Sequence, residues 1–327
     1  MDTQSHASKP AGTLAYLPVG LFGGVMGLSG LALAWRHAQL LFGAPSWVGD
    51  VLGALALLAF VVLAVAYGVK MVSAFAAVKA EFQHPVAGNL FGLVPISMLL
   101  LAILLAPLSL TAARIVWAIG ATAMTLFAWL VVSRWLHLRQ ELVHATPAWI
   151  VPVVGLLDVP LAVPVLQWPE VHGMMMFGLA VGLFFAMPLF TLIMSRLLFQ
   201  EPMPAVMQPT LLIMVAPFSV GFSAYVATTG QIDGMAQALY MLTLFIMAVL
   251  LARLRHLGNC PFRLSWWSVS FPLAASSVST QRYAEHAQMA LTTGIAAVLL
   301  AFATAVILGL LLRTLRGIAR GELAALS

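Results

Sequence analysis

Charged residues are scarce in this chain of 327 residues. They make up 8% of it, whereas hydrophobic residues make up 62% and the mean hydropathy is +1.04. Soluble globular domains carry about 25% charged residues. The shortage of charge therefore excludes a soluble globular protein and predicts a polytopic membrane protein, with no room between its apolar stretches for a separate soluble domain.

Cysteine is nearly absent too, because Cys260 is the only one and cannot form an internal disulfide. No Cys/His cluster has zinc or iron–sulfur spacing. The eight histidines fall at expected span ends, in loops or in the polar tail over residues 1–13, where they would not face one another across a haem. A phosphate loop, a Ser/His/Asp arrangement and a pair of inward carboxylates are also lacking. We expect no metal, no cofactor, no catalytic residue and no enzyme activity.

Ten apolar stretches are each long enough to cross a hydrocarbon core about 30 Å thick, which takes roughly 20 helical residues. Their approximate bounds are 14–35, 48–71, 89–106, 111–135, 148–167, 171–195, 208–227, 235–252, 266–281 and 287–312. The predicted fold class is therefore all-α, with ten transmembrane helices. We expect a short cytoplasmic tail over 1–13 without a removed signal peptide, a single channel domain over 14–312 and a short cytoplasmic tail over 313–327.

Lysine and arginine are distributed unequally between the two ends of these stretches. Three lie on the side away from the N-terminus, namely Arg36, Arg114 and Arg282. The other twelve lie on the N-terminal side, namely Lys9, Lys70, Lys79, Arg134, Arg139, Arg196, Arg253, Arg255, Arg263, Arg313, Arg316 and Arg320. Because cytoplasmic loops keep positive charge, both termini are predicted in the cytoplasm. The high pI of about 9.8 then reflects contact with anionic lipid rather than a nucleic-acid partner.

Proline interrupts the odd-numbered stretches near their middles, whereas most even-numbered stretches run without a break. The interrupting residues are Pro95, Pro152, Pro217 and Pro272, spaced by 57, 65 and 55 residues. Each removes a backbone N–H and frees a carbonyl, which lipid cannot satisfy, so these helices should be buried in protein or line a wet cavity. Glycines, including Gly23 and Gly24, fill the same role in the first stretch. The spacing predicts five helical hairpins, with the odd-numbered helices around a central pore and the even-numbered helices outside.

Short motifs along the chain resemble those of the TehA branch of the tellurite-resistance/dicarboxylate transporter family, which includes the plant guard-cell slow anion channel. They are Asp50-Val51-Leu52-Gly53, Tyr67 with Lys70, Val78-Lys79-Ala80-Glu81-Phe82, His84-Pro85-Val86, Leu93-Val94-Pro95-Ile96, Glu201-Pro202, Ala216-Pro217, Ser223-Ala224-Tyr225, Trp266-Trp267 and Ser270-Phe271-Pro272-Leu273. The resemblance implies a homotrimer with one pore in each protomer. It also implies a bacterial inner-membrane location and an aromatic gate at mid-membrane, which by position is Phe271; ordinary bundle packing is the alternative role for this ring.

Anion selectivity has less support from the residues, since freed carbonyls favour cations. Selectivity would come from hydroxyl donors, helix N-termini and basic mouths. The candidate donors are Ser97, Ser219, Ser223, Ser270, Ser276 and Ser277, although serines also pack helices by bonding to their neighbours. The cytoplasmic arginines would concentrate anions at one entrance.

Asp158 is the one acidic residue expected well inside a stretch, and an intramembrane acid is a functional candidate by default. It would be protonated, or paired with Arg114 or Arg282, or would repel anions in the pore; a buried carboxyl bonded to a freed carbonyl is the structural alternative.

Two function classes follow. The first is a channel for small anions gated by Phe271, and the second is a proton-coupled transporter of an oxyanion or C4-dicarboxylate, such as sulfite, tellurite or malate, acting through Asp158. The expected partners in both classes are small anions, the lipid bilayer and sister protomers.

Overall fold

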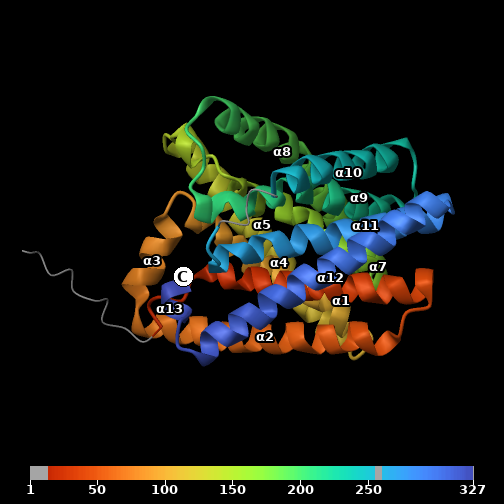
Figure 1. Cartoon of the computed structure of the whole chain (residues 1–327), viewed down its shortest axis with the longest axis horizontal. Helices are drawn as coiled ribbons and strands as arrows, with labels where there is room; N and C mark the ends of the chain where they lie inside the picture. Colours follow the sequence, from red (N-terminus) through yellow and green to blue (C-terminus); the bar gives the residue numbers. More distant parts are fainter. Residues whose placement is uncertain (1–13, 255–259, 327) are drawn as a thin grey trace, which may run out of the picture.

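The computed structural model describes residues 14–254 and 260–326, and throughout these ranges the regular elements are helices. The long helices lie side by side along the longest axis of the molecule (Figure 1). The predicted tail over 1–13 and the predicted cytoplasmic Arg255 lie outside the described residues.

Five helices run without a break and form the outside of the bundle. They are α2 (Ser46–Ser73), α5 (Leu110–His137), α8 (His172–Phe199), α10 (Gly234–Leu254) and α12 (Ala290–Ala319). We call them the outer helices.

Five further segments alternate with the outer helices along the chain, and each begins as a 3-10 helix that continues into α-helix. We call them the inner segments. They are η1 (Val19–Leu21) with α1 (Phe22–Phe42), η2 (Ala87–Gly92) with α4 (Leu93–Leu105), η4 (Pro147–Ile150) with α6 (Val151–Val154), η5 (Gly155–Asp158) and α7 (Val159–Leu166), η7 (Ala205–Val215) with α9 (Ala216–Thr229), and η9 (Leu264–Val269) with α11 (Ser270–Ala287).

Burial separates the two sets of helices. In the most apolar window of each outer helix, 22 to 33% of the residues are buried, against 67 to 83% for the first four inner segments. Apolar side chains that cover an outer helix on its exposed face would meet lipid, since contiguous exposed apolar surface of this extent does not occur on soluble monomers. The all-α polytopic fold and its division into inner and outer helices are confirmed.

The expected number of ten spans is not confirmed. Among the described residues, nine helices are long and apolar enough to cross a membrane. The segment η9–α11, predicted as a span over 266–281, is not one of the nine because its second half is polar, with Ser279, Thr280, Gln281 and Arg282 in succession. It nevertheless lies among the long helices, alongside α12 in Figure 1.

The four predicted helix-breaking prolines lie at the junctions between 3-10 and α-helix. Pro95 and Pro272 are the third residues of α4 and α11, and Pro152 and Pro217 are the second residues of α6 and α9. Proline fits the first turn of an α-helix because its fixed φ is already helical there. The irregularity at mid-segment is thus a change of helix type rather than a kink inside a continuous α-helix.

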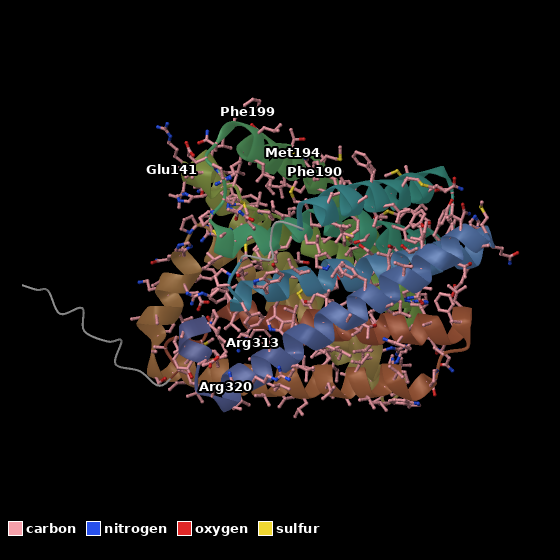
Figure 2. All side chains as sticks on the ribbon, in the orientation of Figure 1. Glu141, Phe190, Met194, Phe199, Arg313 and Arg320 are labelled. Atoms are coloured by element: carbon pink, nitrogen blue, oxygen red, sulfur yellow. The ribbon has the colours of Figure 1, made fainter. Side chains whose placement is uncertain are left out.

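Short elements close the end of the bundle where the described chain begins, which we call the N-terminal end. Helix α3 (Phe75–Gln83) and helix α13 (Leu323–Leu326) lie at this end, and so does the C-terminus, which is marked C in Figure 1. Arg313 and Arg320 lie on the same side of the molecule (Figure 2). The remaining short 3-10 turns are η3 (Leu142–His144), also at the N-terminal end, and η6 (Pro169–Val171), at the opposite or far end.

Candidate functional site

A cavity of about 280 Å³, the N-terminal cavity, opens among the 3-10 halves of the inner segments. Every inner segment contributes to its wall, for example through Gly23, Leu93, Val151, Ile213 and Trp267. No outer helix supplies a lining residue among those that the structure describes. The cavity therefore lies on the axis of the inner bundle, as the sequence pattern predicts for a central pore.

A second cavity of about 180 Å³, the far cavity, lies among the α-helical halves of the same five segments. Leu33, Leu100, Leu161, Val220 and Ala275 represent α1, α4, α7, α9 and α11 in its wall. It adjoins a wider hollow at the far end, because Leu33, His37, Ile103 and Val165 line both. The two cavities and the hollow follow one another along the inner bundle.

Phe271 lines both the N-terminal cavity and the far cavity, and it is the one described residue common to their walls. It is the second residue of α11, and its side chain is 9% exposed. The ring lies beside Gly30 of α1, where a built Cβ would be at van der Waals distance from Phe271 Cδ2, 3.5 Å, and too close to Ala274 Cβ, 2.8 Å. The predicted gate residue lies where the two cavities meet.

Glycines let α1 and α11 approach closely behind this ring. A Cβ on Gly27 would lie 2.2 Å from Ser270 Oγ, and one on Gly24 would lie 3.3 Å from Trp267 Cδ2. Trp267 in turn donates from Nε1 to Thr314 Oγ1 of α12 at 3.0 Å. The backbone position of Phe271 is thus held by contacts on both sides of α11.

The structure brings some of the predicted site residues to the cavities and leaves others behind the wall. Gly23 and Pro272 line the N-terminal cavity, and Ser223 lines the far cavity. The walls of both cavities omit Gly24, Pro95, Pro152, Pro217, Ser97, Ser219, Ser270, Ser276, Ser277 and Asp158. The predicted set thus contains three wall residues besides Phe271.

Five of the six candidate serines donate their hydroxyls to helix carbonyls, and the sixth, Ser277, accepts from Gln281 Nε2 at 3.1 Å. Ser97 Oγ donates to Leu93 O at 2.7 Å, and Ser276 Oγ donates to Pro272 O at 2.7 Å. Ser219 likewise donates to Val215 O, Ser223 to Ser219 O and Ser270 to Trp267 O. A hydroxyl committed in this way cannot donate to an anion, so these bonds correspond to the packing role of serine in helical bundles.

Asp158 is 2% exposed, and its Oδ1 is buried without a hydrogen-bond partner. Neither expected base pairs with it: Arg114 donates to the carbonyls of Leu166 and Gln167 at 3.0 and 2.7 Å, and Arg282 contacts Ser223 O. Asp158 is not in the described wall of either cavity, so it does not contact the space where an anion would lie.

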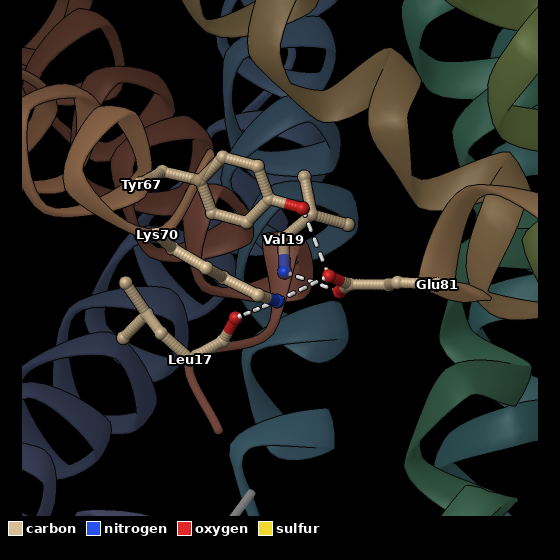
Figure 3. A network of polar contacts seen from close by, with 5 residues as sticks. All are labelled: Leu17, Val19, Tyr67, Lys70 and Glu81. Atoms are coloured by element: carbon tan, nitrogen blue, oxygen red, sulfur yellow. Dashed lines mark hydrogen bonds and ion pairs between the residues drawn. The ribbon is translucent and has the colours of Figure 1, made fainter. Parts of the chain in front are cut away.

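A buried ion pair joins α2 and α3 to the start of the first inner segment, whose Gly20 lines the N-terminal cavity; Figure 3 shows this network. Lys70 of α2, 2% exposed, binds Glu81 Oε2 of α3 and Leu17 O at 2.6 Å each. Tyr67 OH donates to Glu81 Oε2 at 2.8 Å, and the Val19 N–H donates to Glu81 Oε1 at 2.7 Å. Glu81 therefore caps the first inner segment and ties it to α2 and α3, next to wall residue Pro18.

Sequence reasoning assigned no role to this network, although it quoted Tyr67, Lys70 and Glu81 as motif residues. The signal available in the sequence was Lys70 near the end of an otherwise apolar stretch, with Glu81 eleven residues later. A lysine in that position needs an acidic partner if it is buried.

Two basic residues in the wall of the far cavity were also missed. They are His37 and Arg282, whereas the N-terminal cavity has no charged residue in its described wall. His37 was placed beyond a span ending at residue 35, but α1 continues to Phe42. The basic residues therefore line the cavity at the far end, whereas the sequence predicted that cytoplasmic arginines would concentrate anions at the other entrance.

In the part of the chain that the structure describes, no three His, Cys, Asp or Glu side chains lie close enough together to hold a metal ion.

Comparison with known proteins places this geometry in a family. A family profile described as voltage-dependent anion channel matches residues 16–315. The chain is 27% identical to the S-type anion channel SLAH3 of Arabidopsis thaliana over 306 residues, which cover 91% of this chain and 48% of the plant protein. It is 27% identical to the guard cell S-type anion channel SLAC1 of the same plant, covering 83% and 50%. The chain thus spans about half the length of these two relatives.

A bacterial relative aligns with this chain over a similar share of both proteins. The tellurite resistance protein TehA homolog of Haemophilus influenzae is 28% identical over 272 residues, which cover 82% of this chain and 81% of that protein. The family match extends across every inner segment, both cavities and the Lys70–Glu81 network. The chain is therefore a multi-pass membrane protein that belongs to the voltage-dependent anion channel family.

Proposed function

We propose that this protein is a gated anion channel in which the ring of Phe271 occludes a pore formed by the five inner segments. The observation that carries the proposal is that Phe271, and no other described residue, is shared by the walls of two cavities lying in series. Removing the ring would join a cavity of about 280 Å³ to one of about 180 Å³.

The physical basis of the block is the apolar character of the constriction. Phe271 packs against α1 at Gly30 and lies on a wall whose members in the N-terminal cavity are mainly apolar. A narrow apolar passage excludes hydrated ions, because the ion must lose water without gaining a polar partner. Displacement of the ring, rather than a large helix movement, would then open the path.

Anion selectivity in this proposal follows from the distribution of charge along the path. The far cavity is lined by His37 and Arg282, and no acidic residue is in the described walls of either cavity. A guanidinium in a confined, low-dielectric passage attracts anions and repels cations more strongly than it would in water.

We further propose a homotrimer with one pore in each protomer, set in a bacterial inner membrane with both termini in the cytoplasm. The TehA relative supports the bacterial setting, and the positive-inside distribution of lysine and arginine supports the orientation.

The test is anion flux into proteoliposomes containing the wild type or Phe271→Ala, with chloride, nitrate and malate supplied in turn. We expect slow wild-type flux and fast mutant flux of the small anions, driven by the ion gradient alone. Phe184→Ala is the matched control, because it truncates a phenylalanine that is 70% exposed on the outer helix α8. Equal flux from Phe271→Ala and Phe184→Ala would contradict the gate.

The coupled-transport alternative makes a different prediction in the same assay. If transport depended on protonation of Asp158, the flux would vary with pH and Asp158→Asn would remove that dependence. The position of Asp158 outside both cavity walls argues against this outcome.

A further inference from the structure

Arg282 supplies the guanidinium in the wall of the far cavity. It projects from the last third of α11, three helical turns beyond Phe271, and the rest of the wall is apolar except for His37 and Ser223. The enclosure is formed by residues of all five inner segments. A positive charge is therefore held on the axis that an ion would follow.

No carboxylate in the described part of the chain bonds the guanidinium directly, and Glu285 acts on it electrostatically from farther away. Its hydrogen bonding there consists of one long contact, from Nη1 to Ser223 O at 3.5 Å. No Asp or Glu side chain lies within ion-pair distance of it in residues 14–254 and 260–326, although Glu285 follows one turn later on α11. Glu285 is exposed and lines a different hollow. Most of the five N–H donors of Arg282 are thus free for another acceptor.

His37 faces the same cavity from α1. Its Nδ1 is buried and has no hydrogen-bond partner. Protein interiors rarely leave such atoms unsatisfied, so this imidazole nitrogen, in the same cavity wall as a guanidinium with spare donors, points to a missing ligand. Ser223 is not an additional donor, since its hydroxyl bonds Ser219 O.

We propose that Arg282 and His37 bind a small inorganic anion in the far cavity, either a halide or a planar oxyanion such as nitrate. The inference rests on the proposed anion-channel function and assigns its binding step to two residues. A volume of about 180 Å³ holds the anion with a few waters, at about 30 Å³ for each water. The site lies beyond Phe271, so it would be filled from the far end while the ring still closes the path to the N-terminal cavity.

The test measures the chloride concentration that gives half-maximal conductance, using Phe271→Ala as the conducting parent and adding Arg282→Gln. Loss of hydrogen bonds to a charged group weakens binding by about tenfold or more, so we expect a rise of that size. Arg320→Gln is the control: it removes the same charge from a side chain at the N-terminal end that is 71% exposed and lies 3.9 Å from Glu322, where solvent screens it, and should have a much smaller effect. Equal half-saturation in the parent and Arg282→Gln would overturn the site while leaving the channel intact.

Arg282→Lys separates charge from shape. Lysine keeps the positive charge but lacks the planar fork that fits an oxyanion. We expect it to restore chloride half-saturation and to restore nitrate less well. A lysine variant that matches Arg282→Gln for chloride would contradict electrostatic binding.

A direct binding measurement distinguishes failure of the site from failure of the channel. If Phe271→Ala carries no current, the proposed function is wrong, but calorimetric titration of purified protein with nitrate still reports on the site. Binding to the wild type that His37→Ala weakens and Arg282→Gln removes would support the site. Wild-type protein that takes up no nitrate would overturn it.

Discussion

At the scale of single residues, burial decides which charges matter. Lys70 is enclosed and bonded to Glu81 and Leu17, whereas the Arg36–Asp50 pair is exposed to solvent. The Coulomb attraction of an exposed pair is largely offset by hydration and screening. Breaking an enclosed pair instead leaves one charge without water or a partner.

This contrast predicts unequal effects of two equivalent substitutions. Glu81→Gln leaves the Lys70 ammonium buried without its counter-charge, and should lower the free energy of unfolding by about 3–5 kcal/mol. Asp50→Asn should lower it by at most about 1 kcal/mol. Denaturant or thermal unfolding of both variants in the same detergent measures the difference. Similar losses in the two variants would mean that the Lys70–Glu81 network contributes no more than a surface pair.

Residues also show why part of the site escaped prediction. The succession Trp35-Arg36-His37 reads as the polar end of a span, so the predicted helix ended at 35. In the structure α1 continues to Phe42, because His37 lies against a cavity and Arg36 reaches Asp50 of α2. A sequence does not reveal which polar residues have a cavity to face.

At the scale of elements, the position of Phe271 depends on how closely α1 and α11 pack. Gly27 and Gly30 face Ser270 and Ala274 at distances that leave no room for a side chain. The sequence predicted irregular inner helices from their prolines, and a flexible, closely packable first helix from its glycines, with Gly27 and Gly30 among them. It could not identify Gly27 as the closest contact, because the rotation of two helices about their axes is set by all their neighbours together.

Gly27→Ala should therefore separate α1 from α11. The new Cβ would lie 2.2 Å from Ser270 Oγ and 2.4 Å from Ser270 Cβ, so a backbone must move. Overpacking of this kind costs about 1–3 kcal/mol, and the shift should also raise anion leak because it displaces Phe271. Gly68→Ala on the outer helix α2 is the control, since a Cβ there meets nothing within 4 Å. If Gly27→Ala is as stable as Gly68→Ala and leaks no more anion, the packing account is wrong.

At the scale of the whole molecule, the alternation of inner segments and outer helices along the chain produces the circular arrangement of helices. Each inner segment is followed by an outer helix, so five successive hairpins place the polar and irregular halves inside and the apolar helices outside. This arrangement was predictable from proline spacing, because irregular backbone cannot face lipid. The number of spans was harder to predict. Helix α11 is shielded by its neighbours, so it can be more polar than a helix that faces lipid.

The single native cysteine offers a test of the proposed orientation. Cys260 lies between α10 and η9 at the N-terminal end, so a membrane-impermeant maleimide should label it only after spheroplasts are permeabilised. In a Cys260→Ser background, Leu108→Cys at the far end, where the native side chain is 80% exposed, should react in intact spheroplasts. The reverse labelling pattern would mean that the protein has the opposite orientation in the membrane.

The central claim is that one side chain separates the two cavities, and a size series at that position tests it most directly. Currents of Phe271→Trp, wild type, Phe271→Leu, Phe271→Val and Phe271→Ala would be recorded in planar bilayers under the same chloride gradient. The account predicts that current rises steadily as the side chain becomes smaller, with the Ala variant largest and the Trp variant closed. Currents that do not follow side-chain size would contradict it.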